Sequence, residues 1–189
     1  MKFCSHCGEK VEHKIPQGDN RPRYVCNSCD LVHYQNPRII AGYIAEYEDK
    51  ILLCKRAIEP RHGLWTLPAG FMENQETTLQ AAKRETFEEA NAQISNSQLF
   101  CTISIPYISQ VYIMYRGELV DGFSKPGIES IETDLYTEQQ IPWDNLAFPI
   151  ITESLKLYFS DKNKGQFNLY DGEMLRDENQ KIITNIYSK

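Results

Sequence analysis

Residues 70–92, G-F-M-E-N-Q-E-T-T-L-Q-A-A-K-R-E-T-F-E-E-A-N-A, are typical of a loop that runs into a helix. Gly70 follows a strand-like segment and a turn, and a glycine there permits a sharp bend at little steric cost. Thr77 and Gln80 have the spacing of a capping box, which predicts a helix beginning near Thr77. Asn91 suits the left-handed residue that ends a helix. The stretch therefore predicts one helix with defined ends.

Three carboxylates share one face of this predicted helix. At about 100° per residue, Glu85, Glu88 and Glu89 project from the same side. Like charges at these spacings repel one another, which favours a bound cation over a plain solvated acidic helix. Mg²⁺ prefers oxygen ligands and commonly bridges to substrate phosphates. Arg84 and Glu76 would then orient the carboxylates through forked hydrogen bonds.

The segment resembles the Nudix box, Gly-x5-Glu-x7-Arg-Glu-apolar-x-Glu-Glu-x-Gly-apolar. Its first glycine and its charged positions are matched by Gly70, Glu76, Arg84, Glu85, Glu88 and Glu89. Two positions depart from the pattern, because Thr86 replaces an apolar residue and Asn91 replaces the last glycine. A left-handed helix end tolerates asparagine, and neither position is a metal ligand of the box. The resemblance is therefore highly specific.

The resemblance implies a site for Mg²⁺ or Mn²⁺ on this helix. Glu85 and Glu89 would be direct ligands, and Glu88 would be a ligand or would orient water. The backbone carbonyl of Gly70 would join them, and Arg84 belongs to the same catalytic set. Such a site polarises phosphoryl oxygens, which implies hydrolysis of a diphosphate that links a nucleoside to a second group X.

Nudix enzymes often use a further glutamate from outside the box. Glu132 is the residue chosen for that role, with Glu129 as a second candidate in the same loop before residues 135–136. Each of the two is also an ordinary surface residue when judged alone. Full turnover after Glu132→Gln would remove Glu132 from the catalytic set.

Six cysteines include four with the spacing of a zinc site. Cys4-x2-Cys7 and Cys26-x2-Cys29 are separated by 18 residues, which matches a ribbon whose two turns each present a pair of sulfurs. Four thiolates saturate Zn²⁺, so the expected role of the metal is structural. A pair of redox dithiols is the weaker alternative.

Length, composition and charge limit the remaining possibilities. A chain of 189 residues, 41% of them hydrophobic, is enough for one domain with its own core and a small appendage. The sequence contains neither a signal peptide nor an apolar run of the roughly 20 residues that cross a membrane. We therefore expect a cytoplasmic protein without membrane contact. The formal net charge of −6 makes nucleic acid an unexpected partner.

The order of predicted elements divides the chain into three parts. Residues 1–34 are expected to form the zinc ribbon, residues 35–160 the Nudix domain, and residues 161–189 a C-terminal extension with no assignable structure. The middle part is expected to hold strands at 39–47, 51–56, 92–94, 99–105, 110–115 paired with 117–120, and 135–136, then a helix at 149–159. This order predicts an α+β fold, an α/β sandwich. The Nudix resemblance adds that helices pack on both sides of a mixed sheet.

The substrate is inferred from similarity in segments outside the Nudix box. A zinc ribbon before a Nudix domain resembles the NADH pyrophosphatase group, but that group's Ser-Gln-Pro-Trp-Pro-Phe-Pro-x-Ser signature is missing. The segments 52–56, 63–70, 105–112 and 142–148 look closer to the zinc-ribbon Nudix proteins that hydrolyse FAD and ADP-ribose. The resemblance therefore implies that FAD or ADP-ribose is cleaved to AMP and X-phosphate. It also implies a homodimer, because related enzymes use the ribbon near the subunit interface.

Several side chains are candidates for binding the nucleotide. Rings that could stack on an adenine or a flavin are Tyr107, Tyr112 and Tyr34. Cations that could meet phosphate oxygens are Arg56, Lys55 and Arg61. Each also has an ordinary interpretation, as a core ring or a solvated charge.

Two other functions compete with this hypothesis. The first is a non-enzymatic sensor of ADP-ribose or a related nucleotide, although the intact carboxylate face argues against a discarded active site. The second is cleavage of NADH or removal of a nucleotide cap from RNA, with the ribbon guiding the strand. The acidic charge and the missing signature weaken that alternative.

Overall fold

The computed structural model describes residues 1–188, which separate into two compact units after Pro37. The first unit is a three-stranded antiparallel sheet of β1 (Val11–Lys14), β2 (Arg23–Cys26) and β3 (Val32–His33). Among its described residues the buried apolar side chains are Cys4, Val25 and Cys26. So small an apolar core cannot hold a unit together unaided, so its stability depends on the cysteines.

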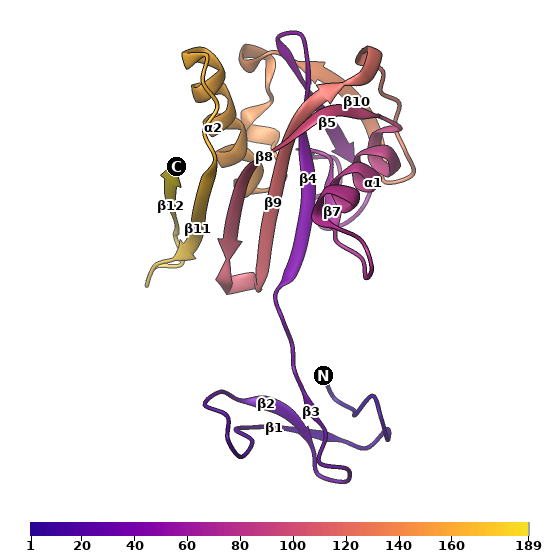
Figure 1. The fold of residues 1–189 in the computed structure, drawn as a ribbon, viewed down its shortest axis with the longest axis vertical. Helices are drawn as coiled ribbons and strands as arrows, with labels where there is room; N and C mark the ends of the chain where they lie inside the picture. Colours follow the sequence, from indigo (N-terminus) through magenta and orange to yellow (C-terminus); the bar gives the residue numbers. More distant parts are fainter. Residues whose placement is uncertain (189) are drawn as a thin grey trace. The chain divides into compact units, whose positions relative to one another are not determined.

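The second unit is built on a nine-stranded sheet (Figure 1). Seven strands lie in the order β10-β5-β4-β9-β8-β11-β12, while β6 pairs with β5 and β7 pairs with β4. The strands are β4 (Arg38–Tyr47), β5 (Lys50–Arg56), β6 (Trp65–Thr66), β7 (Ala69–Phe71), β8 (Ile94–Ile105), β9 (Gln110–Leu119), β10 (Ser130–Tyr136), β11 (Tyr170–Arg176) and β12 (Ile182–Ser188). The helices are α1 (Thr78–Ala90) and α2 (Pro149–Lys164), with short 3-10 turns η1 (Pro106–Ile108), η2 (Val120–Gly122), η3 (Glu138–Gln140) and η4 (Trp143–Asn145).

The sheet is mixed, which confirms the predicted fold class. The pairs β4–β9 and β8–β11 are parallel, and the remaining pairs are antiparallel. The expected pairing of 110–115 with 117–120 is wrong, because residues 117–119 continue the same strand, β9, and Val120 begins η2. The expected strand 99–105 lies within β8, which begins at Ile94, so residues 92–93 of the other expected strand lie outside it; bulges absorb the polar residues 95–98.

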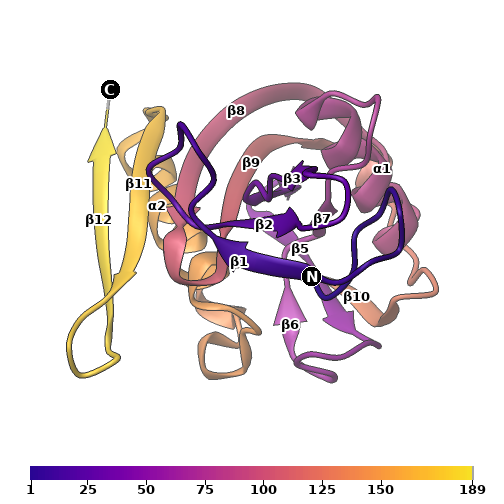
Figure 2. The same cartoon turned by 90° about the horizontal axis from the view of Figure 1, so that it is seen from below.

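Alternation along β4 builds a separate core on each face of the sheet. Ala41 and Ala45 pack in the cluster that contains Ala81 and Ala82 of α1, and these small side chains let the helix approach the strand closely. Ile44 points the other way, into the cluster that contains the apolar residues of α2. The two helices therefore cover opposite faces of the sheet (Figures 1 and 2).

The end of the chain is more ordered than the sequence predicts. Helix α2 continues past residue 159 to Lys164, where Gly165 ends it in the left-handed conformation. Buried Asp161 accepts hydrogen bonds from the Tyr170 hydroxyl (2.7 Å) and the Asn168 backbone N–H (2.8 Å). These bonds turn the chain into the hairpin β11–β12, which lies at the edge of the sheet beside β8 (Figure 2).

Within the described part of the chain, neither helix is both long enough and apolar enough to cross a membrane.

Candidate active site

Helix α1 begins and ends where the sequence predicts. The Thr77 hydroxyl accepts a hydrogen bond from the Gln80 backbone N–H (3.2 Å), and the Thr77 backbone N–H donates to the Gln80 side chain (2.8 Å). The capping box is therefore confirmed. Asn91 adopts the left-handed conformation (φ 48°) at the other end, as expected. These two caps fix the angular position of every side chain between them.

Two of the three predicted carboxylates on α1 are buried. Glu85 is 9% exposed and Glu89 is 5% exposed, whereas the Glu88 side chain is 53% exposed. Burial, with the neighbouring charge of Glu85, raises the pKa of Glu89 to about 8. Burial also raises the pKa of Glu85, although the hydrogen bond and charge of Arg84 oppose that shift. A cation beside these groups would relieve the cost of burying both charges.

Strand β7 brings the backbone against the carboxylates. The Ala69 backbone N–H donates to Glu89 Oε2 (3.3 Å). Gly70 faces Glu85 so closely that a Cβ at this position would collide with the carboxylate. The Gly70 backbone therefore lies beside the predicted metal ligands because it has no side chain.

Arg84 links the acidic side chains of the box. Its Nε and one terminal nitrogen donate to both Glu76 oxygens (3.1 and 2.8 Å), in a fork. The other terminal nitrogen donates to Glu85 Oε1 (2.7 Å) and Glu88 Oε2 (3.0 Å). Glu76, first among these partners, raises the pKa of Arg84. Arg84 thus orients carboxylates, which is the role expected from the sequence.

The two departures from the box have local explanations. Thr86 is fully buried, and its hydroxyl donates to the Ala82 carbonyl (2.8 Å), so no polar atom is left unpaired. The Asn91 side chain donates to the carbonyls of Lys125 (3.0 Å) and Pro126 (3.3 Å). Asparagine therefore ends the helix, and its side chain also anchors the loop between β9 and β10, which a glycine cannot do.

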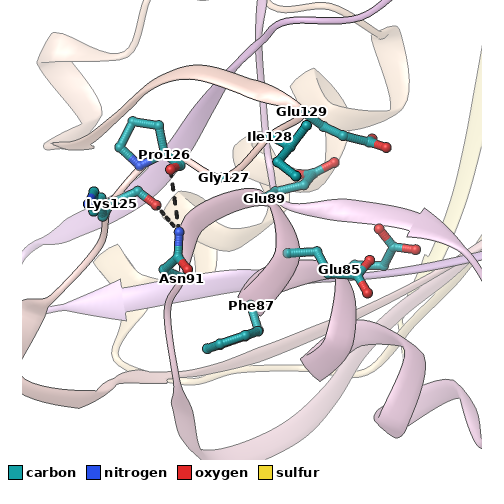
Figure 3. Close-up of a pocket in the computed structure, with 10 residues that line it drawn as sticks. Glu85, Phe87, Glu89, Asn91, Lys125, Pro126, Gly127, Ile128 and Glu129 are labelled. Atoms are coloured by element: carbon teal, nitrogen blue, oxygen red, sulfur yellow. Dashed lines mark hydrogen bonds between the residues drawn. The ribbon is translucent and has the colours of Figure 1, made fainter.

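Residues 125–129 of this loop close a pocket of about 750 Å³ over the carboxylates of α1. We call this pocket the acidic pocket. The Gly127 backbone N–H donates to the Glu89 carbonyl (3.0 Å), and a Cβ on Gly127 would collide with the Glu88 carbonyl. The loop can approach α1 this closely because residue 127 is glycine. Glu129 lines the pocket with Glu85 and Glu89 (Figure 3), and its charge raises the pKa of both.

Glu132 lies outside the acidic pocket. It is on β10, directly opposite Lys55 of β5, and the two side chains form an exposed ion pair (3.3 Å). Lys55, a candidate phosphate contact, is therefore already paired with a carboxylate. Of the two glutamates proposed from the sequence, Glu129 is the one that the fold brings to the carboxylates.

A second cavity of about 600 Å³, which we call the arginine cavity, is lined by four of the six predicted nucleotide contacts, and Tyr34 and Lys55 are not among its lining residues. Arg56, Tyr107 and Tyr112 all line it, together with Gly70, which also contacts Glu85. Tyr112 is only 8% exposed, so most of its ring belongs to the core. Arg56 pairs in register with Ser130, the residue after Glu129, so the cavity lies beside the acidic pocket.

Sequence reasoning missed two arginines of this cavity. Arg38 begins β4 and Arg176 ends β11, and both are exposed lining residues. The guanidinium groups lie near aromatic rings, with distances to the ring centroids of 4.8 Å for Arg38 over Phe71, 5.2 Å for Arg56 over Phe148 and 4.6 Å for Arg176 over Tyr107. Nothing in the local sequence around Arg176 indicates that it meets Tyr107, because β11 reaches the cavity only by pairing with β8.

The first unit holds the four predicted zinc ligands together. Their Sγ atoms all lie within 4.8 Å of one another, with Cys4–Cys29 at 3.8 Å and Cys7–Cys26 at 3.4 Å. A tetrahedral site with Zn–S bonds of about 2.3 Å separates its sulfurs by about 3.8 Å, so the cluster fits Zn²⁺. The pKa of the Cys26 thiol is lowered to about 7, and the largest cause is a hydrogen bond from the Cys29 backbone N–H. His33 Nε2 lies 3.3 Å from Cys4 Sγ, where it can support the thiolate.

Family models match both units. The model described as Nudix N-terminal, a zinc ribbon, matches residues 2–35, and the NUDIX domain model matches residues 36–143. The second match alone covers more than half of the 189 residues.

Similar proteins carry related names. A protein named NAD-capped RNA hydrolase NudC from Photobacterium profundum is 28% identical over 86% of this chain and 61% of its own length. One of the same name from Haemophilus influenzae is 36% identical over 76% of this chain and 52% of its own. The chain therefore spans about half to three-fifths of the length of these relatives.

Solved structures agree. The crystal structure of a NUDIX hydrolase from Nitrosomonas europaea is 52% identical, with a TM-score of 0.86 over 92% of this chain and 99% of that one. The NUDIX domain of Shewanella oneidensis NrtR, solved with ADP ribose, is 20% identical with a TM-score of 0.55 over 67% of this chain and 90% of that one, and it shares the fold. From the matched box, the fold and these similarities, we conclude that the chain belongs to the Nudix hydrolase family.

Proposed function

We propose that the protein hydrolyses the diphosphate linkage of a nucleoside diphosphate derivative and releases AMP and X-phosphate. The observation that carries this proposal is the acidic pocket, which buried Glu85 and Glu89 line together with Glu129. Like-charged carboxylates are costly to bury together unless a cation lies among them. The arginine cavity adjoins them through Gly70 and offers cations and rings for the rest of a nucleotide.

Different residues have different roles in the proposed reaction. Glu85, Glu89 and the Gly70 carbonyl would hold Mg²⁺ or Mn²⁺, with Glu88 at the exposed side. When bound, the cation would polarise a phosphoryl oxygen and lower the pKa of the attacking water. Arg84 keeps the Glu85 carboxylate in place.

Water attacks one phosphorus, and the bond from that phosphorus to the bridging oxygen breaks. We propose that Glu129, placed across the pocket from α1, accepts the proton that water loses.

The preferred substrate is proposed on two grounds. FAD or ADP-ribose is the first candidate, because the sequence resembles the zinc-ribbon Nudix proteins that cleave them. NADH or an NAD cap is the second candidate, because the relatives from Photobacterium profundum and Haemophilus influenzae are named for NAD-capped RNA.

The experiment measures AMP release from FAD, ADP-ribose and NADH, each with Mg²⁺ or Mn²⁺, by the wild type and by Glu89→Gln. Cleavage of one compound by the wild type alone supports the proposal and names the substrate. Tight binding of one compound without cleavage of any would replace the hydrolase with a sensor. Circular dichroism of Glu89→Gln checks that the variant is folded.

Two further parts of the proposal concern the whole protein. A homodimer is proposed from the family resemblance, and a cytoplasmic location is proposed from the sequence. Light scattering of the purified protein tests the first, since a mass near the 21.9 kDa of one chain would contradict a dimer.

A further inference from the structure

The arginine cavity has a charge opposite to that of the chain. Four arginines line it, Arg38, Arg56, Arg61 and Arg176, and none of its described lining residues is acidic. The chain as a whole has a formal net charge of −6. Four cations around one cavity repel one another, and an anion bound between them would offset that repulsion.

None of these four arginines has a carboxylate within ion-pair distance in residues 1–188. Arg23, Arg84 and Arg116 each have such a partner. Three of the cavity arginines lie over rings instead, as described above. A guanidinium stacked on a ring keeps its N–H edge available for an anion, and its forked donors suit phosphate.

The number of cations exceeds what the cleaved linkage needs. A diphosphate linkage carries about two negative charges, and a divalent cation on the carboxylates already balances them. A ligand without another anionic group would leave the four guanidinium groups without a counter-charge. We propose that the enzyme prefers, among the nucleoside diphosphate derivatives that it cleaves, those with a third phosphate outside the cleaved diphosphate, and that Arg176 recognises this phosphate. This inference rests on the proposed function.

Arg176 is better placed for this role than Arg56. Arg56 pairs in register with Ser130, the residue after Glu129 of the acidic pocket, and so lies on the side of the diphosphate. Arg176 comes from hairpin β11–β12, beyond the matched residues 36–143. One of its terminal nitrogens donates to the Gln180 side chain (3.1 Å), which leaves its other donors free to bind phosphate.

The third phosphate has two possible sources. It is either a monoester on a small nucleotide or the first phosphodiester of a capped RNA. Three pairs of compounds differ by such a group: NADPH and NADH, CoA and dephospho-CoA, and an NAD-capped oligoribonucleotide and NAD. Preference within the first two pairs indicates a monoester, and preference within the third alone indicates RNA.

The test measures kcat/KM for each pair with the wild type, Arg176→Gln and Arg176→Lys. We expect the wild type to prefer the phosphate-bearing member of at least one pair by about tenfold or more, the effect of one charge-assisted hydrogen bond. Arg176→Gln should bring that ratio towards one, and Arg176→Lys should keep part of it. Arg21→Gln is the matched control, because exposed Arg21 is outside the cavity and also lacks a carboxylate partner among the described residues. Equal rates within every cleaved pair, or a preference that Arg176→Gln leaves unchanged, would overturn the inference.

Binding of products tests the same inference without turnover. Calorimetry compares 2′,5′-ADP and 3′,5′-ADP with AMP, for the wild type and for Arg176→Gln. Tighter binding of a bisphosphate by about tenfold or more, lost in the variant, supports recognition of a third phosphate. Equal binding contradicts it. If neither a pair nor FAD nor ADP-ribose is cleaved, the proposed hydrolase fails, and calorimetry still decides the role of Arg176.

Discussion

The two predicted metal sites of this protein differ in how completely the chain forms them. The four cysteine sulfurs of the first unit already converge at distances that suit Zn²⁺. The carboxylates of α1 do not converge in this way, because Arg84 lies between Glu85 and Glu88 and donates to both. A saturated thiolate site needs only its metal, whereas an open carboxylate site leaves positions for water and substrate. The difference separates a metal that holds a fold together from a metal that takes part in a reaction.

The largest expected effect comes from removing zinc. Cys26→Ser, or a zinc chelator, should unfold the first unit, because structural zinc contributes on the order of 10 kcal/mol to folding in such small units. The second unit should remain folded, since it has its own two cores. Heteronuclear NMR with and without the chelator checks this. Ribbon peaks that keep their dispersion after zinc is lost would contradict a structural role for the metal.

The next effect distinguishes the two candidate glutamates from outside the box. Glu129→Gln should lower kcat by roughly 100-fold or more, the usual contribution of a general base. Glu132→Gln is the matched control, and it should leave kcat nearly unchanged because Glu132 lies in an exposed pair with Lys55. Steady-state kinetics at saturating Mg²⁺ measures both. The reverse order of the two losses would return the role to Glu132.

A smaller loss is expected where the backbone meets the carboxylates. Gly70→Ala places a Cβ against the Glu85 carboxylate and must displace it. Misplacement by about 1 Å can cost roughly 100-fold in rate, so we expect kcat to fall by up to that factor. Gly165→Ala is a folding control, because Gly165 lies at the end of α2 with open space around it, although its left-handed φ adds strain. Unchanged kcat in Gly70→Ala would show that Glu85 can move without loss.

The smallest effect is a pH dependence of stability in magnesium-free protein. The pKa of Glu89 is raised from 4.5 to about 8, so the folded state binds this proton more tightly than the unfolded state does. The stability from Glu89 is therefore full below about pH 4.5 and is lost as pH rises through about 8. Each tenfold difference in proton affinity between the two states corresponds to about 1.4 kcal/mol of unfolding free energy, or a few degrees in Tm.

Glu89→Gln cannot ionise, so its Tm should match that of the wild type near pH 5 and exceed it at pH 8 to 9. Dialysis without a chelator removes Mg²⁺ and keeps zinc in place. Saturating Mg²⁺ should then raise the Tm of the wild type more than that of Glu89→Gln. Parallel melting curves at every pH would show that Glu89 does not titrate between the two states.

The parts that sequence reasoning predicted well are those whose causes are local. The ends of α1 follow from Thr77, Gln80 and Asn91, which act within one helical turn. The cysteine cluster follows from two short turns with fixed spacing. In both places the chemistry of a few neighbouring residues determines the geometry.

The parts that it missed depend on distant partners. Segment 170–176, Y-D-G-E-M-L-R, has too few apolar residues to indicate a strand, and it becomes β11 by parallel pairing with β8. The position of Glu129 depends on the contact of Gly127 with α1, far earlier in the sequence. Arg176, at the end of β11, reaches Tyr107 only when β11 has paired with β8. Local propensity carries no information about such contacts.

The hairpin β11–β12 also bears on how such a protein can diverge. The carboxylates and their supports come from residues 69–129, whereas this hairpin forms a separate wall of the arginine cavity. A lineage could therefore replace or reshape its last two strands and acquire a new ligand while its hydrolytic chemistry stays intact. Exchanging residues 170–188 between related proteins would be a short route to altered selectivity.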